Sequence, residues 1–213
     1  MQTFDYKKEY KDLYLPGKDP VLIQVPPMHF AAVEGEGNPN DPHGEYKTAL
    51  ELLYAISYTL KMSYKSGQQI EGYYPYVVPP LEGLWRMADG SPGVDYANKS
   101  GFCWISMIRL PEFVTPEVFD WAKEEAMRKK KLDTKKAYLF PLEEGLCVQC
   151  MHLGSYDEEP ATTARMNQFL TDQGYREDFT GQRMHHEIYL SDPRRAAPER
   201  LKTVIRHPVA AIK

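Results

Sequence analysis

The sequence has few cysteines and no long apolar run. Of 213 residues only three are cysteines, Cys103, Cys147 and Cys150, which is an odd number and too few for a disulfide scaffold in a chain this long. No stretch approaches the roughly 20 apolar residues that cross a bilayer. The polar, charged start also lacks the apolar core of a secretion signal. We therefore expect a cytoplasmic protein with reduced thiols and no membrane partner.

The chain also lacks an excess of positive charge. It has 26 Lys plus Arg against 30 Asp plus Glu, a net charge of −4. Nucleic-acid binding depends on clustered basic side chains that neutralise phosphates, so no nucleic-acid partner is expected. The basic run at residues 129–131 is interpreted as the solvated end of a helix, where cations favour the helix dipole. An apolar fraction of 42% excludes a disordered chain.

Familiar catalytic and cofactor motifs are missing as well. The sequence contains no phosphate-binding loop, no G-x-S-x-G elbow and no H-E-x-x-H helix. Cys147 and Cys150 form a C-x-x-C, but they lie in a strand-like run. Residues i and i+3 of a strand point to opposite faces, so these thiols should not share a metal or form a disulfide. We expect no metal site and no cofactor.

The predicted strands and helices occur in an order that is repeated in the second part of the chain. Extended runs near residues 21–33 precede an amphipathic helix from Asp41 to about Met62, and a similar order resumes at Ala137. Met107–Leu110 resembles Glu187–Leu190, and the helix start at Pro116 resembles Pro198. The sequence thus predicts an α+β fold of two fused strand–helix–strand–strand modules, with chance similarity as the alternative. The sheets should be antiparallel, with helices on one face and a ligand cleft at the junction.

We divide the chain by this pattern. Residues 1–19 are predicted to be an N-terminal extension, and residues 20–213 a single domain with halves at about 20–132 and about 133–213. Two fused copies would be related by a pseudo-two-fold axis.

The run His185-His186-Glu187 gathers three titratable groups on one predicted strand. Alternation puts Glu187 and Tyr189 on the face of His185, and His186 on the other face with Ile188. Ile188 and Leu190 would suit the helix layer, so Glu187 should point away from the helices into the junction. The alternatives are a surface glutamate, or a salt bridge with Arg86 or Arg109.

The aromatic content is biased towards tyrosine, with 15 Tyr against 8 Phe and 3 Trp. Tyrosine and tryptophan suit half-buried walls that face both protein and ligand, but composition alone favours core packing and ordinary surface tyrosines. Trp85 and Trp104 lie in strand-like runs, and either role fits them.

Six sequence segments carry a resemblance to a known family. They are Tyr6–Tyr10 with Leu13-Tyr14, Val25–Met28, Glu34–Asn40, Leu53-Tyr54 with Tyr58–Met62, Pro80–Trp85 and His186–Arg195. Together they resemble the stand-alone members of the GyrI-like small-molecule-binding proteins. The resemblance implies a duplicated β-α-β-β (SHS2-like) module and a central cleft that takes lipophilic, aromatic or cationic molecules. Since the module pair fills the chain, a DNA-binding head and a transcription-factor role are not expected.

The resemblance also implies roles for individual residues. Glu187 matches the acidic residue of the family pocket, and Trp85 its tryptophan motif. With Trp104, Tyr76, Met107 and Tyr189 they form the predicted ligand-binding set. Stand-alone relatives are linked to hydrolysis of cyclopropane-bearing DNA alkylators, so Glu187 is the expected base that activates water. The alternative is a binding or sequestering protein in which Glu187 is only a counter-ion. A third hypothesis is an interaction protein with an exposed aromatic surface.

Overall fold

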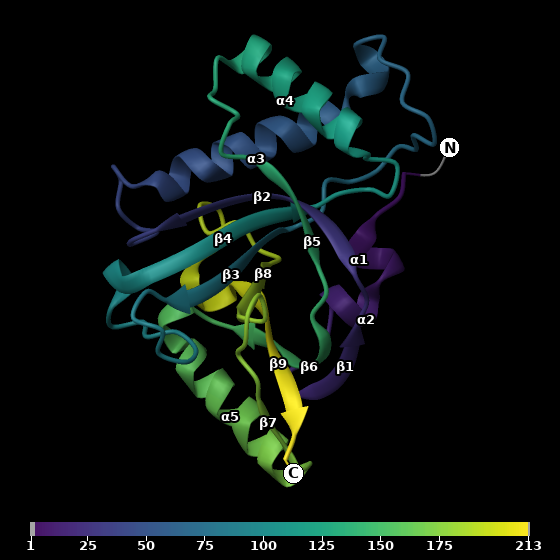
Figure 1. Ribbon diagram of the computed structural model, residues 1–213. Helices are drawn as coiled ribbons and strands as arrows, with labels where there is room; N and C mark the ends of the chain where they lie inside the picture. Colours follow the sequence, from purple (N-terminus) through teal and green to yellow (C-terminus); the bar gives the residue numbers. More distant parts are fainter. Residues whose placement is uncertain (1–2, 213) are drawn as a thin grey trace.

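The computed structural model describes residues 3–212, and a nine-stranded antiparallel sheet runs through it (Figure 1). The strands are β1 (Val21–Val25), β2 (Met28–Glu36), β3 (Leu81–Met87), β4 (Phe102–Arg109), β5 (Tyr138–Leu142), β6 (Gly145–Leu153), β7 (Tyr175–Glu177), β8 (His185–Tyr189) and β9 (Lys202–Ala211). The helices are α1 (Tyr6–Glu9), α2 (Lys11–Tyr14), α3 (Glu45–Lys61), α4 (Pro116–Lys130) and α5 (Glu159–Asp172). The expected α+β class with an antiparallel sheet is confirmed.

The strand order has a symmetry of its own. It runs β1-β6-β9-β8-β3-β4-β2-β5, with β7 beside β9. In this order β1, β2, β3 and β4 of the first half correspond to β5, β6, β8 and β9 of the second half, respectively. If each strand is replaced by its counterpart, the same order is obtained when it is read from the opposite edge of the sheet. Each half also has its long helix after its second strand. A duplicated unit would produce this arrangement, and the duplication itself stays a prediction.

Helices α3 and α5 lie on the same face of the sheet, one over each half. The α3 side chains pack with Trp85 and Trp104, while those of α5 pack with Val148 and Ile205. Glu187 pairs across strands with Gly83 on one side and Ile205 on the other, so the two helices share its face. Helix α4 packs on α3 as a further layer (Figure 1).

The opposite face is covered too. The short helices α1 and α2 place Tyr6 and Tyr14 in a buried cluster with Phe30, Met107 and Ile188. The Tyr-rich segment before β3 joins the same cluster through Tyr76. The N-terminal segment therefore packs as part of the core of this fold.

Several details differ from the sequence predictions. Helix α3 begins at Glu45 after an extended Gly44, because Asp41 and Pro42 lie in a turn. Pro198 opens only a single 3-10 turn before β9. Strand β8 pairs with β3, and in the symmetric strand order it corresponds to β3, whereas the sequence comparison matched it to Met107–Leu110 in β4. The halves form one continuous sheet through the β3–β8 pair.

Other expectations are confirmed. Thr115 caps α4 by accepting the amide of Val118, and Pro160 lies in the first turn of α5. Cys147 and Cys150 fall in different buried clusters on the two faces of β6. Within residues 3–212 no helix combines the length and the apolar character needed to span a bilayer.

Candidate functional site

Strands β3, β4 and β8 bring four of the predicted site residues together at the junction of the halves. Trp85 lies directly across from Trp104, and Tyr189 accepts a hydrogen bond from Trp85 Nε1 at 3.0 Å. Glu187 lies on the same face two residues before Tyr189 and is 6% exposed. The prediction that Glu187 points away from the helices is wrong, since this is the face that α3 and α5 flank.

A glycine makes room for this arrangement. Gly83 pairs with Glu187, and a Cβ at this position would lie 2.7 Å from Trp85 Nε1 and 3.0 Å from the Tyr189 hydroxyl. The missing side chain lets the indole and the phenol meet above the backbone of β3.

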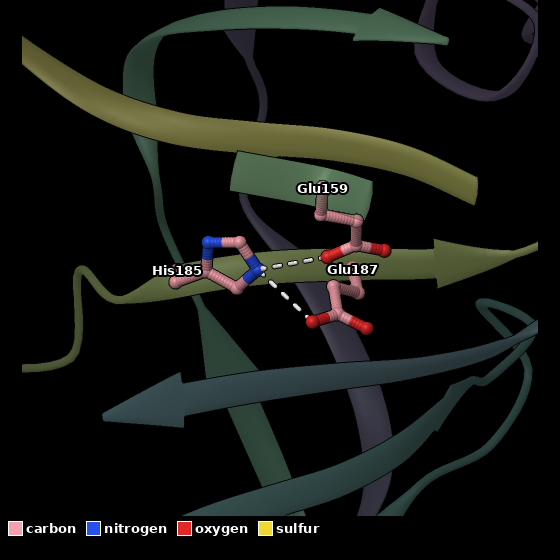
Figure 2. A group of neighbouring side chains, drawn as sticks. All are labelled: Glu159, His185 and Glu187. Carbon is pink, nitrogen blue, oxygen red and sulfur yellow. Dashed lines mark hydrogen bonds and ion pairs between the residues drawn. The ribbon is translucent and has the colours of Figure 1, made fainter. Parts of the chain in front are cut away.

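Glu187 belongs to a buried acidic cluster with His185 and Glu159 (Figure 2). His185 Nε2 lies 3.0 Å from Glu187 Oε1 and 3.8 Å from Glu159 Oε2. Glu159 is fully buried at the start of α5, and its Oε1 has no hydrogen-bond partner in the described chain. Burial and the neighbouring charge of Glu187 raise the pKa of Glu159 well above its usual value.

Among the residues that the structure describes, no lysine or arginine balances the charge of this cluster. Across residues 3–212, the ion-pair contacts of Glu159 and Glu187 are with His185 alone. Two carboxyl groups so close together favour retention of a proton between them. Such a cluster can take up and return a proton, and it can also attract a cation.

Four half-buried tyrosines surround the acids. Tyr46 comes from α3, Tyr96 from the β3–β4 loop, Tyr156 from the turn before α5, and Tyr189 from β8. Burial raises the pKa of each hydroxyl, and the charge of Glu187 is the next cause in all four. They therefore remain neutral O–H donors at physiological pH.

Aromatic contacts join these tyrosines to the tryptophans. Tyr46 packs at 5.6 Å from Trp85 and 5.1 Å from Trp104, and Tyr156 lies edge-on to Tyr189 at 5.9 Å. Tyr96 donates a hydrogen bond to Glu159. The junction is thus filled by side chains, and a ligand that reached Glu187 would have to displace tyrosines.

A second histidine stands behind His185. His185 Nδ1 lies 2.7 Å from His207 Nε2, and His207 Nδ1 lies 2.6 Å from Glu177 Oε1. Burial lowers the pKa of His207, so this ring is neutral at physiological pH. Since a neutral ring has one N–H, which the carboxylate of Glu177 accepts from Nδ1, His207 Nε2 accepts from His185.

The remaining predicted ligand residues lie elsewhere. Met107 and Tyr76 are buried in the cluster on the opposite face of the sheet, and Tyr76 donates to the Ser57 carbonyl. The structure does not bring them to Glu187. Arg109 pairs with Glu112 at 3.6 Å, so it is not the partner of Glu187.

His186, the neighbour of His185, is part of a different cluster on that opposite face. Its ring nitrogens lie 2.9 Å from Glu144 and 2.9 Å from Glu82. Arg206 donates to Glu144 at 3.0 Å and to the Leu13 carbonyl at 2.8 Å. These charges raise the pKa of His186 to about 9 and, against the effect of burial, lower that of Glu144 to about 2.

Sequence reasoning missed Glu159, His207 and the three tyrosines outside β8. Glu159 opens a helix, where acidic residues are common for dipole reasons and carry no functional signal. His207 and Glu177 lie on strands that no motif linked to β8. The alternation of β8 was the one usable signal, and it correctly placed Glu187 with His185.

Fold and site together define an α+β protein with an aromatic, acidic site between two helices. The chain belongs to the GyrI-like family, whose model, described as a GyrI-like small molecule binding domain, matches residues 18–210. Comparison with curated proteins gave no match.

Two solved structures similar to this chain are described as structures of a hydrolase from Listeria innocua. Each is 46% identical to this chain and covers 98% of it and 100% of its own length, with TM-scores of 0.88 and 0.90. The C-terminal domain of EcmrR has 13% identity and a TM-score of 0.52, covering 91% of this chain and 98% of its own; it shares the fold alone.

Proposed function

We propose that this protein binds flat, lipophilic, aromatic or cationic molecules between α3 and α5 and hydrolyses those that carry a strained cyclopropane-type ring. The observation that carries the proposal is Glu187, a buried carboxylate within hydrogen-bond distance of His185 and surrounded by tyrosine and tryptophan rings. Its 46% identity to Listeria innocua proteins described as hydrolases supports a hydrolytic reaction.

The aromatic residues have a binding role in this proposal. Trp85 and Trp104 form the floor and Tyr46 covers them, so a planar ligand would replace Tyr46 and stack on the indoles. A ligand cation would gain about 0.5–2 kcal/mol from each ring that it faces. The acidic cluster would supply the opposite charge.

Glu187 is the proposed base. It takes a proton from a water molecule whose oxygen bonds to a ring carbon, while the ring C–C bond breaks and its electron pair moves to a conjugated carbonyl oxygen. Tyr189 is the proposed donor to that oxygen: Trp85 Nε1 donates to the phenol oxygen, which leaves the O–H of Tyr189 free to donate. The product oxygen finally receives the proton.

The test is turnover by Glu187→Gln. Purified protein is incubated with a cyclopropane-bearing aromatic alkylator, and the water adduct is followed by mass spectrometry. We expect the variant to lose about 10²–10⁴-fold in rate, the range for a positioned base, while binding of the intact compound persists. Glu34→Gln, an exposed change on β2, is the control and should leave the rate unchanged.

Two outcomes would contradict the proposal. Stoichiometric binding without product would favour a sequestering protein in which Glu187 is a counter-ion. Turnover that survives in Glu187→Gln would remove the base assignment.

A further inference from the structure

His185, His207 and Glu177 lie in one continuous hydrogen-bonded line behind Glu187. The line crosses three strands: Glu187 and His185 are on β8, His207 is on β9 and Glu177 is on β7. Glu187, His185 and His207 are buried, while the side chain of Glu177 is 24% exposed. A buried base is thereby connected to a carboxylate at the surface.

The polarity of the line follows from the contacts. His207 Nδ1 donates to Glu177, which leaves His207 Nε2 as an acceptor for the Nδ1–H of His185. His185 Nε2 then faces Glu187 Oε1 at 3.0 Å, a contact that requires one proton between the two atoms.

From this geometry we infer that His185 stores the proton that Glu187 takes from water, and that His207 and Glu177 are positioning residues that keep His185 Nδ1 protonated. The inference rests on the proposed function, because it assigns the proton of the same reaction. In the resting pair the shared proton is on Glu187 Oε1. When Glu187 Oε2 takes the proton from water, the Oε1 proton passes to His185 Nε2, and the ring becomes an imidazolium. The proton returns through Glu187 to the product oxygen, so no net proton is gained or lost.

Glu177 stabilises the imidazolium by its charge. His207 connects the two groups, because its Nδ1–H donates to the Glu177 carboxylate and its Nε2 accepts from His185. A carboxylate behind a functional histidine commonly orients the ring in this way. The other titratable groups that face His185 are Glu159 from α5, at 3.8 Å, and Tyr96 from the β3–β4 loop, at 3.3 Å. Together with Glu187 and His207 they set the proton affinity of the ring.

Glu177→Gln is the variant that tests the inference. The amide oxygen can still accept from His207, so the line stays connected and only the charge is lost. Without that charge the imidazolium is less stable. The acid limb of the kcat profile should therefore move to lower pH by about one unit, on the order of one partly screened charge. Glu51→Gln, an exposed change on α3, should leave the profile where it is.

A readout that needs no turnover accompanies the rate. In ¹⁵N-labelled protein, NMR of the imidazole nitrogens should show His185 Nδ1 protonated from pH 5 to 9, with Nε2 titrating at lower pH in Glu177→Gln. His207→Gln, which breaks the fixed order of donors, should remove the preference for protonated Nδ1.

The results separate the two ideas. A His185 ring that is neutral with its proton on Nε2, or a titration unchanged in Glu177→Gln, would overturn the storage role whether or not the protein hydrolyses the alkylator. Expected NMR shifts without any turnover in the wild type would refute hydrolysis and leave the shared proton standing.

Discussion

Two adjacent histidines of β8 face buried glutamates on opposite sides of the sheet, and the two clusters differ in charge. On one side His186 and Arg206 balance Glu82 and Glu144. On the other side His185 is the only ion-pair partner that the described chain offers to Glu159 and Glu187. The same residue types therefore form a neutral network in one place and an acidic site in the other.

The two clusters also differ in how fully their surroundings satisfy their hydrogen bonds. The Arg206 network reaches the carbonyl of Leu13, and Gln149 Nε2 donates to the carbonyl of Asp12 at 2.5 Å, so these bonds hold the N-terminal segment on the sheet. The His185 cluster is bordered by half-buried tyrosines, and one oxygen of Glu159 in it has no partner among residues 3–212. Satisfied bonds and balanced charge indicate a structural role, while their lack marks the candidate site.

The comparison makes its largest prediction for Glu144. In Glu144→Gln, His186 and Arg206 lose the charge that joins them, and the buried network gains a net positive charge. We expect the free energy of unfolding to fall by about 3–5 kcal/mol, the usual cost of breaking a buried pair. Urea denaturation measures it, and the exposed neighbour Glu143→Gln should stay within about 0.5 kcal/mol of wild type. An equally small effect at Glu144 would refute the structural role.

The pH range of this network follows from the same charges. The folded pKa of Glu144 is lowered from 4.5 to about 2, so its contribution is present above pH 4.5 and lost as pH falls through 2. The pKa of His186 is raised from 6.5 to about 9, so its contribution is complete below pH 6.5 and lost as pH rises through 9. The network stabilises the fold most between these limits.

Glu159→Gln should raise the free energy of unfolding, whereas Glu144→Gln lowers it. Because folding raises the pKa of Glu159, the folded state is favoured below the ordinary value of 4.5 and loses that advantage as pH rises through the folded value. A neutral glutamine removes this loss and can still accept from Tyr96. We expect a gain of about 1 kcal/mol at pH 8, the scale of one unsatisfied buried group. The gain should shrink towards pH 5.

Urea denaturation of both proteins across this pH range provides the measurement. Glu124→Gln on the exposed side of α4 is the control and should show no pH-dependent difference. A loss of stability in Glu159→Gln at pH 8 would mean that the acidic cluster supports the fold as the other one does.

Part of this contrast could be predicted from the sequence. Strand alternation is a local property, so the order of residues alone separates His185 from His186 and Cys147 from Cys150. Alternation could not say which face the helices cover, because Ile188 packs under α1 and α2 and both faces are buried. Glu159 and Tyr96 reach the site from a helix start and a loop, and strand periodicity has no information about either.

The smallest expected change in stability comes from a matched pair of tyrosine variants. In each cluster a tyrosine hydroxyl donates to a buried glutamate, so the two variants compare the clusters directly. Tyr14 donates to Glu82 at 3.3 Å, and Tyr96 donates to Glu159. Glu82 pairs with His186 in the balanced network, so Tyr14→Phe removes a bond within an ion-paired group and should cost about 1 kcal/mol. Burial and the charge of Glu187 raise the pKa of Glu159, so Glu159 can keep a proton. Tyr96→Phe then removes a bond to a neutral group and should cost less than about 0.5 kcal/mol at neutral pH.

The result to compare is which variant loses more free energy of unfolding. Both variants remove one oxygen from the same type of side chain, so a difference between them reports on the glutamate that accepts the bond. Urea denaturation of both variants at pH 7 gives the order, and repeating it at pH 9 tests its cause. As Glu159 loses its proton with rising pH, the cost of Tyr96→Phe should grow towards that of Tyr14→Phe. A Tyr96→Phe cost that equals the Tyr14→Phe cost already at pH 7 would show that Glu159 is ionised there, and the contrast between the two faces would then rest on the tyrosine border alone.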